Sequence, residues 1–168
     1  MYNNFRQEES WYDTAQICLN GHVINSTFKA HPNFNKDYCD RCGESTITEC
    51  KTCNAPIQGY YHVPRIISSS SISTPAYCHK CGKPYPWTQI KLQAAKDLTN
   101  EQDKLTQDDK KQLEQSLDNL VKDSPQTPVA ATRFKKLMEK VGTNTADAFK
   151  QIIIDIVSES ARKMIWGK

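Results

Sequence analysis

The chain has 168 residues, of which 38% are hydrophobic and 24% charged, with a formal net charge of +3 at pH 7. This length fits one ordinary domain or two small ones. No window approaches the ~18 apolar residues of a membrane span, and no apolar run opens the chain as in a secretory signal peptide. We therefore expect a reduced, cytoplasmic protein with no membrane partner.

Composition divides the expected elements into three parts. Residues 1–11 form a polar N-terminal segment, residues 12–86 carry all seven cysteines, and residues 87–168 show helical periodicity. Apolar residues concentrate in the C-terminal half, so the cysteine-rich part lacks a core of normal size and needs metal to fold. A stretch rich in Ser and Pro at 64–76 predicts a mobile insertion within that part.

The cysteines lie at the spacing of metal-binding knuckles. Three Cys-x-x-Cys pairs and one Cys-x-x-x-His motif provide seven thiols and one imidazole, the number that two closed tetrahedral zinc sites require. The eight candidate ligands are Cys18, His22, Cys39, Cys42, Cys50, Cys53, Cys78 and Cys81. We predict that they bind two structural zinc ions. If His22 is not a ligand, His31 is the alternative.

Short strands and tight turns are expected around the knuckles. Residues 23–28, 45–48 and 55–61 have the β-branched and aromatic composition of strands. A residue that tolerates positive φ follows each Cys-x-x-Cys pair, as expected if backbone N–H groups must point at the sulfurs. These residues are Gly43, Asn54 and Gly82.

Two groupings of the eight ligands are compatible with their spacing. In a sequential arrangement the first four hold one zinc ion and the last four hold the other, whereas a cross-brace joins the first pair with the third and the second with the fourth. The local sequence favours the sequential arrangement. The run Cys-x-x-Gly-His followed by Tyr-Cys-x-x-Cys-Gly is typical of one zinc ribbon, and Cys-x-x-Cys-Asn-Ala-Pro-Ile followed by Tyr-Cys-x-x-Cys-Gly is typical of a second.

With these motifs over about residues 18–82, the chain resembles bacterial tandem (double) zinc-ribbon proteins. More specifically, it is similar to an uncharacterised bacterial family with a double ribbon and a helical C-terminal tail. The resemblance implies a small metal-stabilised β fold of tandem zinc ribbons followed by an all-α helical module. The ribbon motifs are specific for metal binding and say little about activity.

The C-terminal part predicts about four helices. The first spans about residues 88–98, with an apolar face of Ile90, Ala94 and Leu98. A capping box that begins at Thr106 opens the second, and Thr127 caps the third. The apolar faces of the second and third helices are expected to hold Leu113, Leu117, Leu120 and Val121, and Ala130, Phe134, Leu137, Met138 and Val141, respectively.

The last helix is expected to run unbroken from Thr143 or Asn144 to about Trp166. Its core face is expected to hold Ala146, Phe149, Ile153, Ile156, Val157, Ser160 and Met164. Further apolar residues extend beyond the ~100° stripe of an ordinary surface helix. We interpret this excess either as packing against the ribbons or as a patch for a protein partner or a second copy. The patch would include Ile154, Ile165 and Trp166.

The function favoured by the sequence is that of a non-enzymatic adaptor. Eight ligands occupy all four coordination positions of each of two zinc ions and leave no position open for a catalytic water. No His-Glu-x-x-His, phosphate loop or Gly-x-Ser-x-Gly motif is present, so no catalytic residue is assigned. Rigid ribbons as one surface and apolar helices as another suit binding of a protein partner or self-association.

Nucleic-acid binding, in a regulatory or phage-defence-type accessory role, is the alternative. Its best residues are Arg133, Lys136 and Lys140, at helical spacing, with Arg41, Lys51 and Lys80 at the knuckle tips. The formal charge gives this alternative little support. Seven metal-bound thiolates and two zinc ions bring the loaded protein close to neutrality.

Overall fold

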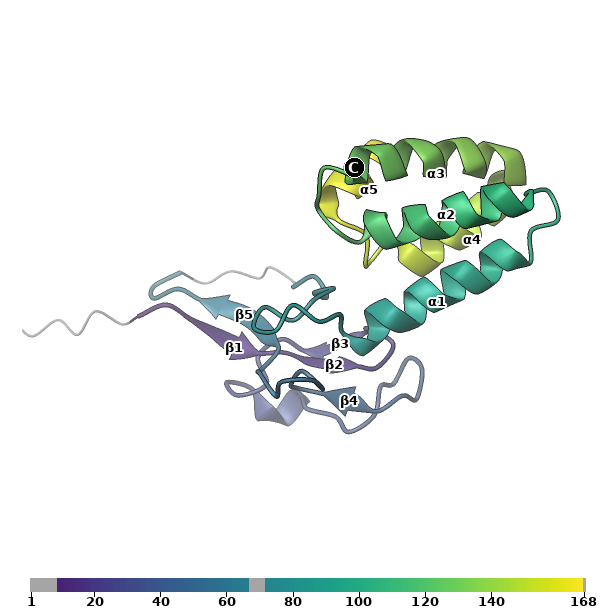
Figure 1. Cartoon of the computed structure of the whole chain (residues 1–168). Coiled ribbons are helices and arrows are strands. Elements are labelled where there is room, and N and C mark those ends of the chain that lie inside the picture. Colours follow the sequence, from purple (N-terminus) through teal and green to yellow (C-terminus); the bar gives the residue numbers. More distant parts are fainter. Residues whose placement is uncertain (1–8, 67–71, 168) are drawn as a thin grey trace, which may run out of the picture. The chain divides into compact units, whose positions relative to one another are not determined.

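The computed structural model describes residues 9–66 and 72–167, so parts of the expected N-terminal segment (1–8) and of the Ser-rich insertion (67–71) lie outside the described residues. The chain forms two compact units (Figure 1). The first comprises Met1–Thr74 and Cys78–Lys83, and the second comprises Pro75–Tyr77 and Pro84–Lys168. Described strands lie in the first unit and described α-helices in the second, which confirms the predicted fold class.

Two small antiparallel sheets form the first unit. Strand β1 (Trp11–Thr14) pairs with β5 (Gln58–His62), while β2 (Gln16–Cys18) lies between β3 (Val23–Asn25) and β4 (Thr46–Ile47). Among the described residues of this unit, few apolar side chains other than cysteines are buried, as expected for a fold that depends on metal. They are Ala15, Ile17, Ile47, Ala55 and Ile57.

The strand expected at 23–28 ends early, at Asn25. The buried Asn25 side chain accepts a hydrogen bond from Thr27 N (2.9 Å) and donates to His31 O (2.9 Å) and to Asn35 Oδ1 (2.7 Å). These bonds turn the chain away from the sheet, because an Asn side chain that bonds the backbone two residues on forms an Asx turn.

Five helices form the second unit: α1 (Pro86–Asn100), α2 (Gln107–Leu120), α3 (Thr127–Val141), α4 (Thr143–Ile153) and α5 (Glu159–Trp166). Helices α2 and α3 lie side by side, and α3 also packs against α4 and α5 (Figure 1). The apolar faces predicted for the second and third helices are buried, and the capping box at Thr106 and Asp109 is formed. None of the helices in the described part of the chain is long and apolar enough to cross a membrane.

Helix α1 differs from its prediction in start and in face. It begins at Pro86, after an extended Tyr85, and its buried residues are Trp87, Thr88, Ala95 and Thr99. Ile90, expected on the core face, is 46% exposed. The two threonines are buried because their hydroxyls are satisfied: Thr88 Oγ1 donates to Ala76 O (2.8 Å) and Thr99 Oγ1 donates to Ala95 O (2.9 Å). The positions of apolar residues alone therefore do not predict which face of α1 is buried.

The prediction of one unbroken last helix is wrong, which raises the count from about four helices to five. The chain leaves α4 after Ile153 and starts α5 at Glu159. Ser158 separates them: its N–H donates to Leu120 O (2.8 Å), and its Oγ accepts from Ala161 N (3.2 Å) as the cap of α5. Because two short helices each present their own face, the apolar residues spread around more than one stripe, and Met164 is 41% exposed rather than buried.

Candidate metal centres

Each of the four ligand pairs lies in a tight turn that joins two antiparallel segments. In each Cys-x-x-Cys turn, the backbone N–H of the first cysteine donates to the carbonyl oxygen five residues later. The carbonyl oxygen of the same cysteine accepts from the backbone N–H four residues later. These bonds, 2.7–2.9 Å long, join Cys39 to Glu44 and Gly43, Cys50 to Ala55 and Asn54, and Cys78 to Lys83 and Gly82. Antiparallel bridges close their bases, between Tyr38 and Ser45, Glu49 and Pro56, and Tyr77 and Pro84.

The turn that carries Cys18 and His22 is one residue tighter. It connects β2 to β3, and Cys18 N donates to His22 O (3.0 Å) while Gly21 N donates to Cys18 O (2.8 Å). The His22 N–H points at Cys18 Sγ (3.3 Å). Backbone donors aimed at sulfur favour the thiolate form that binds metal.

The positive φ angles predicted after the three Cys-x-x-Cys pairs are confirmed: Gly43 has φ 72°, Asn54 57° and Gly82 68°. A Cβ added at Gly43 or Gly82 would meet no atom within 4 Å. Glycine is therefore favoured at these positions for its backbone conformation and not for space, which agrees with the presence of Asn at the third one.

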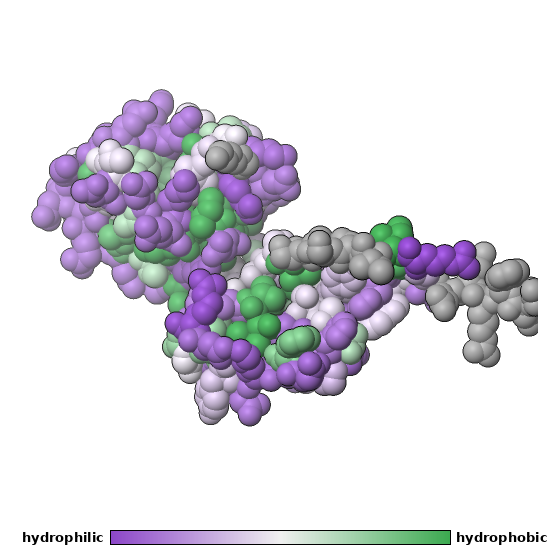
Figure 2. All heavy atoms as spheres, turned by 180° about the vertical axis from the view of Figure 1, so that it is seen from behind, coloured by the Kyte–Doolittle hydropathy of each residue, from purple (hydrophilic) through white to green (hydrophobic). Residues whose placement is uncertain are grey.

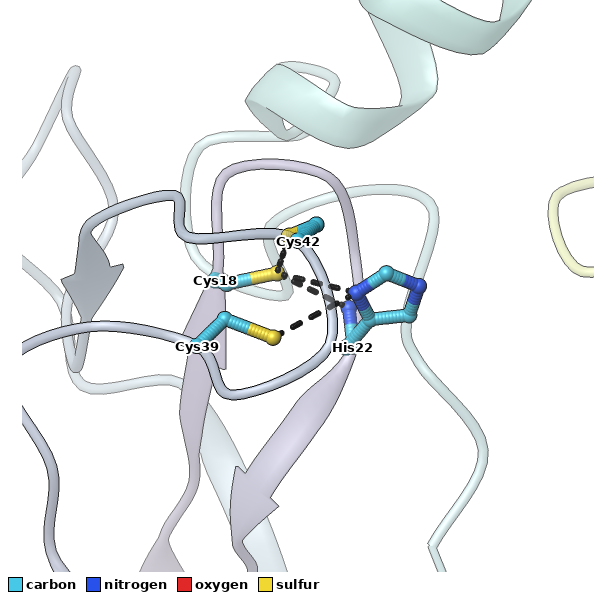
Figure 3. Close-up of side chains that lie close together, drawn as sticks. All are labelled: Cys18, His22, Cys39 and Cys42. Carbon is cyan, nitrogen blue, oxygen red and sulfur yellow. Dashed lines mark hydrogen bonds between the residues drawn. The ribbon is translucent and has the colours of Figure 1, made fainter.

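The first tetrad brings together Cys18, His22, Cys39 and Cys42, whose ligand atoms all lie within 4.8 Å of one another (Figure 3). Cys18 Sγ is 3.8 Å from Cys42 Sγ, and His22 Nδ1 is 3.5 Å from both Cys18 Sγ and Cys39 Sγ. His31, the alternative ligand, is not part of this cluster. Its Nδ1 lies 3.1 Å from Thr27 Oγ1.

The second tetrad brings together Cys50, Cys53, Cys78 and Cys81, again with all ligand atoms within 4.8 Å. The sulfurs of Cys50 and Cys81 are 3.7 Å apart, as are those of Cys53 and Cys78. The eight side chains are thus grouped in the sequential arrangement and not in a cross-brace.

Both tetrads have the dimensions of a tetrahedral metal site. Four sulfurs at the usual zinc–sulfur distance of about 2.3 Å lie roughly 3.8 Å apart, and a sulfur and an imidazole nitrogen around the same ion lie roughly 3.5 Å apart. The observed separations are 3.7–3.8 Å and 3.5 Å. Each tetrad therefore has the donors and the spacing to hold one metal ion.

Thiol pKa values differ within the tetrads. Hydrogen bonding from the Glu44 backbone lowers the pKa of Cys42 to about 6, and hydrogen bonding from the Cys81 backbone lowers the pKa of Cys78 to about 6. Burial raises the pKa of Cys18 to about 11. A bound cation lets every thiol of a tetrad ionise, because the metal ligand is the thiolate.

The three cationic residues that the sequence singled out in the second unit all lie on α3. Arg133 and Lys136 are exposed on α3, whereas Lys140 on the same helix forms an ion pair with Asp109 of α2 (2.7 Å). In the first unit, the knuckle residues Arg41, Lys51 and Lys80 are exposed.

Asp13 is a buried residue that the sequence analysis did not single out. It is 2% exposed, and its carboxylate accepts hydrogen bonds from Thr14 N (2.6 Å), Lys29 N (3.0 Å) and Ala30 N (3.2 Å). The available signal was an acidic residue within a strand-like run, Trp11-Tyr12-Asp13-Thr14. Such a residue is seldom fully buried unless it is paired.

A family model described as "Uncharacterized protein conserved in bacteria (DUF2321)" matches residues 11–165. The chain belongs to this family. The match spans the residues of both tetrads and nearly all of the helical unit. No curated protein and no solved structure matches the chain.

Proposed function

We propose that this family member is a non-enzymatic zinc-ribbon adaptor whose C-terminal helices bind a protein partner or a second copy of the chain. Cysteine-rich tetrahedral donor sets favour zinc over hard cations such as magnesium or calcium. Four protein ligands at each site leave no position for a reactive water, which supports a structural role for both ions.

A groove between α3, α4 and α5 is the observation that supports partner binding most strongly. It has a volume of about 350 Å³, and its apolar wall is formed by Phe134, Met138, Ala146, Ile165 and Trp166. Lys135 and Glu139 lie at the same groove and can fix the orientation of a bound segment. A concave, mainly apolar site with a few polar groups is the form that an anchoring side chain requires.

Trp166 is half-buried and held in place within this groove. Its ring meets Phe134 in an edge arrangement, with centroids 6.3 Å apart, and Lys150 Nζ lies 6.0 Å from its ring centroid. A held aromatic ring loses little conformational entropy when a partner docks. Ile154, also expected in the patch, is half-buried in the turn after α4, outside the groove lining. Figure 2 shows patches of hydrophobic residues on the helical unit, surrounded by hydrophilic side chains.

Site-specific photo-crosslinking in the bacterial cell tests this function. A photo-reactive amino acid replaces Lys135 at the groove, and a control protein carries it in place of Lys111, which is exposed on α2. We expect one discrete protein adduct from position 135 that position 111 does not give. Mass spectrometry of the adduct distinguishes a partner from a second copy of the chain.

Two matched substitutions show whether the groove itself is responsible. Ala146→Phe places a ring in the groove and should abolish the adduct, whereas Asp147→Phe adds the same ring at an exposed position one residue away and should leave it intact. Identical adducts from positions 135 and 111, or an adduct with nucleic acid at position 135, would contradict the proposal.

A further inference from the structure

A short segment that precedes the last knuckle is bonded to the start of α1. We name Pro75–Tyr77 the strap; it belongs to the helical unit. Pro75 O accepts a hydrogen bond from Trp87 Nε1 (2.8 Å), and Ala76 O accepts from Tyr85 N (3.0 Å) and from Thr88 Oγ1 (2.8 Å). Trp87 and Thr88 are both 0% exposed, so their donors depend on the strap.

The strap and the start of α1 are the two arms of one hairpin, and half of the second tetrad is its tip. Tyr77 and Pro84 form the antiparallel bridge at its base. Cys78, the residue after the strap, donates its N–H to Lys83 O (2.9 Å). Along the chain, Cys78 and Cys81 therefore follow one segment of the helical unit and precede another, and they form a tetrad with Cys50 and Cys53.

The strap therefore accepts three hydrogen bonds from the start of α1, donated by Tyr85 N, Trp87 Nε1 and Thr88 Oγ1. A metal ion held by Cys78 and Cys81 closes the hairpin tip and limits the separation of the two arms. When the tip is open, the arms gain conformational freedom and the buried donors of Trp87 and Thr88 lose their acceptors more often.

We propose that metal occupancy of the second tetrad controls the order of the first turn of α1. The helical unit thereby responds to the metal state of one tetrad, a form of regulation that goes beyond the proposed adaptor function. The first tetrad has a weaker route to the strap, through the hydrogen bond from Thr74 Oγ1 to Gly21 O (3.0 Å). Loss of metal from the first tetrad should therefore have a much smaller effect on α1.

Hydrogen exchange measured by NMR on the full-length protein tests this coupling. The reporters are the Trp87 indole N–H and the Tyr85 amide, which both donate to the strap, and the Leu117 amide inside α2 serves as a reference. In Cys81→Ser, exchange at both reporters should accelerate at least about tenfold relative to the reference. In Cys42→Ser, which removes a ligand from the first tetrad, it should change by less than about twofold. Equal acceleration in the two variants, or none in Cys81→Ser, would overturn the proposal.

The reverse experiment leaves every metal ligand intact. Because coupling is reciprocal, weakening the strap contact must weaken metal binding at the second tetrad. Thr88→Val removes the hydroxyl that donates to Ala76 O, and the matched control Thr99→Val removes an equally buried hydroxyl that bonds within α1.

Zinc retention is then measured in the presence of a chelator. Alkylation of the released cysteines identifies which tetrad has lost its zinc ion. We expect Thr88→Val to weaken zinc retention at the second tetrad by about fivefold and to leave the first unchanged. Thr99→Val should change neither tetrad. The inference fails if Thr88→Val matches wild type, or if both variants weaken the same tetrad equally.

Discussion

Asp13 on β1 and His62 on β5 join two paired strands through their side chains, with His62 Nε2 3.4 Å from an Asp13 carboxylate oxygen. Burial alone would raise the pKa of Asp13, but hydrogen bonds from the backbone of Lys29, Thr14 and Ala30 outweigh it and keep the pKa below 3.8. The Trp11 ring stacks on His62 with centroids 4.2 Å apart. One ionised carboxylate thus fixes the loop after β3 and supports the aromatic pair on β1 and β5.

Replacement of this carboxylate should destabilise the first unit. In Asp13→Asn, one carboxylate oxygen becomes an NH₂ group that faces backbone donors, and we expect a loss of about 2 kcal/mol in the free energy of unfolding. Urea denaturation at fixed zinc concentration measures it. His62→Phe is the control, since it keeps a ring against Trp11 and removes only the 3.4 Å contact. An Asp13→Asn protein as stable as His62→Phe would show that the carboxylate is not the organising group.

The knuckle glycines should be replaceable by asparagine but not by alanine. Gly82 has φ 68°, and Asn54 occupies the equivalent position of another knuckle with φ 57°. Gly82→Ala should cost about 1 kcal/mol of stability, and Gly82→Asn should cost less, because Asn tolerates left-handed backbone better than Ala. The two variants are compared by the chelator concentration at which each protein has lost half of its zinc. An identical loss in both variants would mean that the site is limited by something other than backbone conformation.

Acid should remove a stabilising contribution from the capping box of α2. Hydrogen bonding to Lys140 and to the Thr106 backbone holds the pKa of Asp109 below its ordinary 3.8. A folded-state pKa below the unfolded value means that the contribution is present above pH 3.8 and is lost as the pH falls through the lower folded value. At pH 6, the helices of wild type should therefore melt at a higher temperature than those of Asp109→Asn. This difference in melting temperature should shrink below pH 3.8. A difference that stays constant with pH would exclude the carboxylate charge as its cause.

Local chemistry made much of the first unit predictable. Metal-ligand spacing identified the Cys and His residues that form both tetrads, and the residues after Cys42, Cys53 and Cys81 indicated where φ must be positive. These features depend on a few neighbouring residues, so they are visible in one sequence. The apolar faces of α2 and α3 were predictable for the same reason, since helical spacing alone defines them.

The remaining features depend on tertiary contacts that the local sequence does not contain. The buried stripe of α1 includes Thr88 because the strap accepts its hydroxyl. The break between α4 and α5 depends on the hydrogen bond from Ser158 N to Leu120 O, between residues distant in the sequence. Asp13 is buried because a loop about sixteen residues further along the chain supplies backbone donors to it.

Native mass spectrometry of two double variants, recorded after treatment with a chelator, tests most directly that the eight ligands hold two zinc ions in sequential tetrads. Wild type should retain two zinc ions. Cys18→Ser/Cys39→Ser removes two ligands from the first tetrad and should retain one ion, whereas Cys18→Ser/Cys50→Ser removes one ligand from each tetrad and should retain none. The reverse result, with none in the first variant and one in the second, would establish a cross-brace, and a wild-type protein that binds fewer than two zinc ions would contradict the account.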